Sequence, residues 1–183
     1  LKYCNLLVGH DLRLWRKDYN ISKIFYSKNE KFSGVLWELS HEIDIINYLF
    51  GLPNYAYARN LQLMNFKKIR NDYSSIQFDF KKFSLNLVLE MISPKYRRKY
   101  EFIFEKKIIV LDLVKNQISL IYKNKERIIY KINNFDKNEM FLALMKNFVF
   151  KKKHSFASFN DICKNTKMLN ILESSSKNKK LYP

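Results

Sequence analysis

Glycine and proline are scarce in this chain, and their scarcity argues against one common class of ligand site. The 183 residues include three prolines and three glycines, which are Gly9, Gly34 and Gly51. Since the glycines lie far apart, the chain has no Gly-rich turn of the kind that cradles the phosphates of a dinucleotide. We therefore expect no cofactor to be bound by this chain alone.

Cysteines and long apolar runs are equally few. Cys4 and Cys163 lie near opposite ends, and neither stands at metal-ligand spacing or close in sequence to a histidine. We interpret them as reduced thiols of a cytoplasmic protein, and we expect no metal site. No apolar run approaches the roughly 18 residues that a membrane span needs, and no secretory signal is visible at the N-terminus. The sequence therefore predicts no membrane partner.

Acidic residues are outnumbered two to one. The chain has 34 Lys and Arg against 17 Asp and Glu, which gives a net charge of +17. A charge of this size is typical of nucleic-acid binding. However, the excess is mostly Lys spread over the whole length, and Lys reads bases less well than Arg. The chain is also rich in residues whose codons are A/T-rich, so we treat a nucleic-acid partner as the least favoured alternative.

Apolar and aromatic residues, in contrast, are plentiful. They make up 47% and 16% of the chain, which indicates one folded domain with a substantial core. We expect residues 1–174 to form this domain and residues 175–183 to be a disordered basic tail. We interpret the abrupt start at Leu1 as a cut through a larger protein, or as the late start of a shortened gene.

Residues 33–53 have the pattern of one well-bounded amphipathic helix. Gly34 opens the stretch, and Gly51 with Pro53 closes it. At 100° per residue, one arc is apolar and predicts a core-facing stripe of Val35, Leu36, Leu39, Ile43, Ile46 and Phe50. The far side carries Trp37, His41, Asp44 and Tyr48, with Glu38 at its edge. This face belongs either to a packed structural helix or to one wall of a site.

The rest of the chain predicts an α+β fold. Residues 1–10 resemble a strand, and a loop with Trp15, Arg16 and Tyr19 follows. From Tyr55 to Ile132 apolar and polar residues alternate, with a break at Pro94, as in an antiparallel meander. Capping patterns near residues 136 and 158 begin two closing helices. We expect a large, mostly antiparallel open sheet with helices packed on one face.

The stretch Ser33–Pro53 resembles a motif of the glucose–fructose oxidoreductase, inositol dehydrogenase and MocA (Gfo/Idh/MocA) family of NAD(P)-dependent oxidoreductases. The specific part is His-Glu-Ile-Asp at residues 41–44, between a Gly-containing turn and a Gly-x-Pro end. The similarity extends more weakly to other positions, which are Trp15, Arg16, Asp18, Tyr19, Tyr26, Ser27, Arg97, Arg98 and the two closing helices.

The resemblance implies a fold, a reaction and a set of site residues. The chain would be the second domain of the family, which follows a Rossmann domain that carries NAD or NADP. His41 would act as acid and base or would orient the reacting hydroxyl, and Glu38 would orient His41 or bind a sugar hydroxyl. Trp15, Arg16 and Tyr19 would border a sugar-like polyol; Asp44 would join them or brace the helix.

The sequence also departs from the family pattern, so other functions stay open. The Gly-rich turn is reduced to Ser33–Gly34, and a later Gly-containing turn reads Glu105–Lys107. These losses are typical of a truncated copy that is inactive without a Rossmann domain, which another chain would have to supply. The alternative is a non-catalytic module that forms a homodimer through its open sheet.

Overall fold

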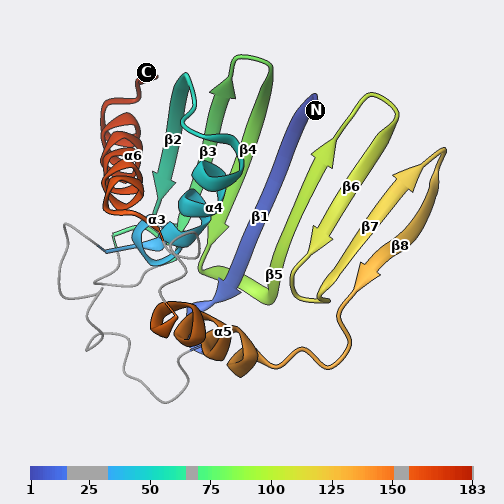
Figure 1. Cartoon of the computed structure of the whole chain (residues 1–183). Coiled ribbons are helices and arrows are strands. Elements are labelled where there is room, and N and C mark those ends of the chain that lie inside the picture. The colour runs from blue at the N-terminus through green and yellow to red at the C-terminus, as the bar shows by residue number, and fades with distance from the viewer. Residues whose placement is uncertain (16–32, 65–69, 151–156, 183) are drawn as a thin grey trace.

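Helices and one broad sheet make up the computed structural model (Figure 1), which describes residues 1–15, 33–64, 70–150 and 157–182. The N-terminal part contains β1 (Tyr3–Asp11), α1 (Leu12–Trp15), α3 (Val35–Glu38), α4 (Ser40–Phe50) and β2 (Tyr55–Leu61). The central strands are β3 (Tyr73–Phe80), β4 (Phe83–Glu90), β5 (Ile92–Ile103), β6 (Lys107–Asp112), β7 (Gln117–Tyr122) and β8 (Lys125–Lys131). The helices α5 (Lys137–Val149) and α6 (Phe159–Asn178) end the described chain.

The sheet has eight strands in the order β2-β3-β4-β1-β5-β6-β7-β8. β1 lies between β4 and β5; it is parallel to β4 and antiparallel to β5, and all other pairs are antiparallel. The mostly antiparallel open sheet is therefore confirmed. The continuous meander is wrong at one point, because β4 and β5 are adjacent in sequence but separated by the first strand of the chain.

Helices α3, α4 and α6 pack on one face of the sheet, against the half that contains β2, β3, β4 and β1 (Figure 1). The predicted apolar stripe is confirmed: Val35, Leu36, Ile43 and Ile46 are fully buried, and Leu39 nearly so. They meet alternating side chains of the central strands, chiefly Cys4, Leu6, Ile76, Phe78, Leu85, Leu87 and Leu89. Burying this much apolar surface is the main contribution to the stability of the covered half.

The predicted helix 33–53 is two helices rather than one. Leu39 breaks it with φ −101° and ψ 27°, so α3 ends at Glu38 and α4 begins at Ser40. Gly34 enters α3 at φ 99°, a conformation that favours glycine, and the N–H of Val35 donates to Asn71. The break sets Glu38 and His41 on different helices.

Pro94 does not end a strand as expected, because β5 runs through it from Ile92 to Ile103. The register with β1 shifts between Gly9 and Asp11, opposite this part of β5. Since a bulged segment needs fewer ladder hydrogen bonds, it tolerates a residue without an N–H.

The last described residues belong to a helix and pair with the sheet, unlike the disordered tail that the sequence suggests. α6 continues to Asn178, Ser175 is fully buried, and Tyr182 pairs with Ala56 on β2. The Ser175 hydroxyl accepts from the N–H of Ala58 and donates to the carbonyl of Lys180, which ties the segment to the sheet. Within the described residues, we find no helix long and apolar enough to cross a membrane.

Candidate active site

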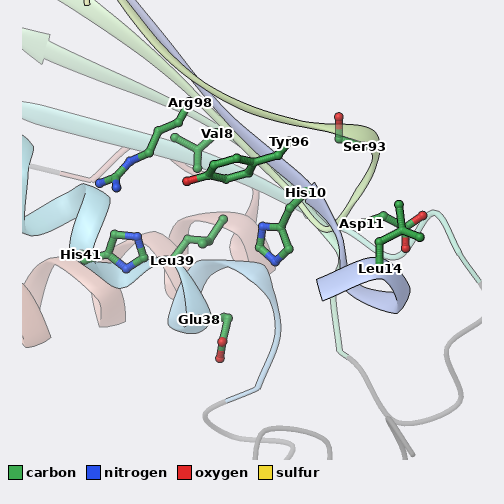
Figure 2. Close-up of a pocket in the computed structure, with 10 residues that line it drawn as sticks. All are labelled: Val8, His10, Asp11, Leu14, Glu38, Leu39, His41, Ser93, Tyr96 and Arg98. Atoms are coloured by element: carbon green, nitrogen blue, oxygen red, sulfur yellow. The ribbon is translucent and has the colours of Figure 1, made fainter. Parts of the chain in front are cut away.

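A cavity of about 440 Å³ opens where the end of β1 meets the beginning of β5 and the α3–α4 break. Figure 2 shows the side chains that surround it. Its lining is Val8, His10, Asp11, Leu14, Glu38, Leu39, His41, Ser93, Tyr96 and Arg98. Most of the surface exposed in the cavity is apolar, although most of the lining residues also carry a polar or ionisable group, and such a mixture is typical of a small-molecule site.

His41 comes from the first turn of α4, which carries it to the cavity wall. Its imidazole is about half exposed, and Nε2 lies 3.2 Å from Oε1 of Glu42. A histidine at a cavity wall with a carboxylate beside its ring is a usual arrangement for proton transfer.

Glu42 lies beneath the cavity wall and is fully buried. Its Oε1 is 2.8 Å from Nη2 of Arg98, and its Oε2 accepts the hydroxyl hydrogen of Tyr100. Arg98 Nε in turn donates to the Tyr100 hydroxyl at 3.3 Å. Arg98 and Tyr100 alternate along β5, so both project to the same face of the sheet. The buried carboxylate is thus paired with the charge of Arg98 and accepts a hydrogen bond at Oε2, whereas Oε1 has no hydrogen-bond partner among the described residues.

The pKa shifts in this network agree with the contacts. Burial alone would lower the pKa of Arg98, but the charge of Glu42 and the contact with Tyr100 outweigh it, so the pKa is raised. Burial, followed by the charge of Glu42, raises the pKa of Tyr100 well above its usual value. Arg98 is therefore charged and Tyr100 neutral over the whole physiological range, as donors to a carboxylate must be.

His10 lies in the cavity near the end of β1 and is almost fully buried. Burial lowers its pKa; the charge of Asp11 raises it in part, and His41 lowers it again. A second imidazole, neutral at pH 7, therefore shares the cavity with His41. The neighbouring Asp11 is held by Arg13, whose hydrogen bonds lower the pKa of that carboxyl.

The structure brings together only some of the predicted site residues. Glu38 and His41 both line the cavity, whereas Asp44 is exposed and accepts from Asn165 on α6. The bracing role considered for Asp44 fits this contact. Trp15 ends α1, next to the cavity residue Leu14, and Arg16 and Tyr19 lie outside the described residues.

The sequence assigned no role to two lining residues, His10 and Tyr96, or to Glu42 beneath the cavity wall. For Glu42 the signal was present, because it follows His41 directly within the motif. Arg98 had been matched to the family pattern, but without a role. Arg98 faces α4 because β1 lies between β4 and β5 in the sheet, and no local sequence pattern reveals this pairing.

No protein-family model matches the sequence, and no curated protein does either. Solved structures, however, share the fold. An NAD-binding oxidoreductase from Klebsiella pneumoniae aligns with 99% of this chain and 58% of its own, at 10% identity and a TM-score of 0.76. An oxidoreductase from Agrobacterium radiobacter, in complex with NAD+, L-tartaric acid and magnesium, aligns with 99% and 56% at 12% identity and 0.68.

A third similar structure is the WlbA dehydrogenase from Bordetella pertussis in complex with NADH and UDP-GlcNAcA. It aligns with 100% of this chain and 54% of its own, at 12% identity and a TM-score of 0.64. The chain thus spans little more than half the length of these structures. Its fold is that of a C-terminal domain of NAD-dependent oxidoreductases.

These neighbours are oxidoreductases of the Gfo/Idh/MocA type. The fold expected from the His-Glu-Ile-Asp resemblance is therefore confirmed, together with its mostly antiparallel open sheet.

Proposed function

We propose that the cavity is the substrate side of a hydride-transfer site that acts on a sugar or sugar-like polyol. The observation that carries the proposal is the placement of His41 at the wall of a 440 Å³ cavity, with a carboxylate at its ring. The fold supports it, since neighbours with this domain include sugar-nucleotide dehydrogenases.

In the proposed reaction, His41 takes the proton of the reacting hydroxyl as the carbon–hydrogen bond breaks. A nicotinamide dinucleotide, where bound, supplies the acceptor for the hydride. Because an alkoxide releases hydride far more readily than an alcohol, a base at this position lowers the barrier. Glu38, Tyr96 and His10 offer polar atoms to the remaining hydroxyls of the substrate.

The residues that the structure describes fit the proposed substrate but not the dinucleotide. Gly9 lies in β1, Gly34 begins α3 and Gly51 ends α4, so none of them forms a strand–turn–helix cradle for phosphates. We therefore place the NAD or NADP site on a dinucleotide-binding domain that lies elsewhere in the protein or on a partner chain. The present chain contributes substrate binding and the proton step.

A ligand titration followed by ¹H–¹⁵N NMR tests this division. We expect myo-inositol or UDP-N-acetylglucosamine to shift the signals of residues 8–11, 38–42 and 93–98, which surround the cavity. NAD+ alone should bind no more tightly than about 1 mM, because the described residues form no phosphate cradle.

Two matched variants on α4 sharpen this titration. His41→Gln should change the response to the sugar, whereas Tyr48→Ala should not, because Tyr48 is 88% exposed and outside the cavity. Binding of NAD+ at about 10 µM or tighter would contradict the division between domains. Sugar probes that shift no cavity signal would contradict the site itself.

The open face of the sheet supports a second candidate function, a dimerising module. In one row across this face Asn5 and Glu101 are partly exposed and Ile128 is exposed, whereas Val110 and Ser119 between them are buried. We propose that a homodimer forms through this face. Sedimentation should show a dimer that Ile128→Lys weakens; a monomer at every concentration would count against the interface.

A further inference from the structure

We infer that the substrate of this site is an acidic polyol, a hydroxy acid whose carboxylate is bound by the Nη1 and Nη2 groups of Arg98 beside His41. The inference rests on the function proposed above and adds the class of substrate to it. It also makes Arg98 a substrate-binding residue, a role that the proposed reaction does not yet give it.

The outer edge of the Arg98 guanidinium, which carries Nη1 and Nη2, has no hydrogen-bond acceptor among the described residues. Nε donates to the Tyr100 hydroxyl at 3.3 Å. Nη2 lies 2.8 Å from Oε1 of Glu42, but that oxygen has no hydrogen-bond partner, so the contact is an ion pair without a hydrogen bond. Because a guanidinium has five N–H donors, most of the donor capacity of Arg98 is unused.

This edge is available to a ligand, because Arg98 lines the cavity and 23% of its side chain is exposed. The ion pair with Glu42 and the hydrogen bond to Tyr100 hold the guanidinium in place. A planar fork of N–H groups matches the two oxygens of a carboxylate better than the single oxygen of a hydroxyl. Arg98 can therefore distinguish an acidic group from a neutral one.

His41 stands next to this edge. Its Nε2 lies 3.2 Å from the same Glu42 oxygen that lies 2.8 Å from Nη2 of Arg98. Figure 2 shows the two groups at the same end of the cavity. Since the imidazole and the guanidinium are neighbours, a carboxylate on Arg98 brings the hydroxyl of the adjacent carbon, or of the next one, to His41. The reacting hydroxyl is therefore on the carbon α or β to the carboxylate.

The other charges around the cavity leave this end to an anion. Asp11 accepts from Arg13 with both of its oxygens, and Glu38 lies away from Arg98 in Figure 2. The net charge of +17 attracts anions to the protein as a whole. Because Glu42 neutralises part of the Arg98 charge, we expect the carboxylate to give a preference of about tenfold rather than very tight binding.

D-gluconate and D-glucitol are the probes that test the inference, because they differ only in one terminal group, a carboxylate in place of a hydroxymethyl group. In ¹H–¹⁵N titrations of the full chain at one ionic strength, gluconate should bind about tenfold more tightly than glucitol. It should shift the signals of residues 38–42 and 93–98, which include the lining residues near Arg98.

Two variants that keep the net charge sharpen the comparison. Arg98→Lys retains a cation beside Glu42 but loses the fork, so the preference for gluconate should fall to about threefold or less. Arg97→Lys is the matched control. Arg97 pairs with Glu90 and does not line the cavity, so this variant should keep the wild-type preference.

Equal affinity of the wild type for the two probes would overturn the inference and leave the site itself intact. This comparison needs no variant, so it decides the question even if Arg98→Lys fails to fold. A wild-type preference in folded Arg98→Lys, or a gluconate response outside the cavity, would also overturn it. If neither probe shifted a cavity signal, the proposed function would fail as well, so the two failures are distinguishable.

Discussion

The two halves of the sheet differ sharply in what covers them. In β1, beneath the helices, Cys4, Leu6 and Val8 are at most 3% exposed. In β8, at the far edge, every residue is exposed, and so is every described side chain of α5 except that of Asn147. The same alternating pattern thus builds a core in one half and a surface in the other.

The difference between the two halves explains the position of the cavity. The cavity lies where the covered half ends, between β1 and β5, so its polar groups stand on elements that are fixed by a full core. A site whose polar groups must keep fixed positions benefits from such support. The outer strands contribute no residue to the cavity lining, and β8 is exposed along its whole length.

The largest expected contrast is in the cost of removing a side chain from each half. Leu87→Ala should lower the free energy of unfolding by about 2–5 kcal/mol, because Leu87 is fully buried and a cavity would remain. Ile129→Ala, at 49% exposure on β8, should cost less than about 0.5 kcal/mol. Urea unfolding of both variants measures the contrast, and equal costs would refute it.

The next effect concerns the turn that leads into the site. Gly34→Ala should destabilise by about 1–3 kcal/mol, because φ is +99° and a Cβ would lie 2.5 Å from Oδ1 of Asn71. Gly51→Ala should cost less, since its φ is also positive but open space surrounds it. Thermal unfolding compares the two; a larger loss for Gly51→Ala would show that the Gly34 turn is not constrained.

A smaller effect is the pH dependence that His10 introduces. Burial lowers the pKa of His10 below 6.5, so in acid the unfolded chain takes up this proton before the folded one does. The contribution of neutral His10 to the free energy of unfolding is therefore complete above pH 6.5. It is lost as pH falls through the pKa of His10 in the folded chain, with a slope of at most about 1.4 kcal/mol per pH unit. In His10→Asn the unfolding midpoint should depend less on pH between pH 5 and 8. An unchanged pH dependence would rule out His10 as its source.

The smallest effect separates bracing from substrate binding at Asp44. Asn165 on α6 hydrogen-bonds both Asp44 and Asn47 on α4. Asn165→Ala should cost about 0.5–1 kcal/mol, as for exposed hydrogen bonds, and should leave the sugar titration unchanged. A weakened response to the sugar in this variant would show that Asp44 belongs to the substrate site.

Periodicity was sufficient to predict the covered half. The stripe Val35–Ile46 and the alternation in β3 and β4 are repeating patterns, and both are buried as expected. The capping box of Ser158 and Asp161 likewise begins α6. Such features depend on neighbours in sequence, so sequence alone reveals them.

The features that escaped prediction depend on contacts between distant residues. No local pattern shows that β1 pairs with β4 and β5, and this insertion brings Arg98 and Tyr100 opposite Glu42. Ile162 shows the same dependence: it is apolar and lies in α6, yet it is 53% exposed, because the residues of this helix that join the core, Met168, Leu169 and Leu172, lie on its later turns. The role of a polar side chain likewise follows from its partners, which the fold alone supplies.

Hydrogen exchange, with and without the saturating sugar probe, tests the central claim most directly, because it compares the two halves in one measurement. If the cavity is the substrate site, the probe should protect the end of β1, the start of α4 and the start of β5, and leave β7 and β8 unchanged. Protection confined to the outer strands, or bound sugar with no protection around His41, would contradict the account.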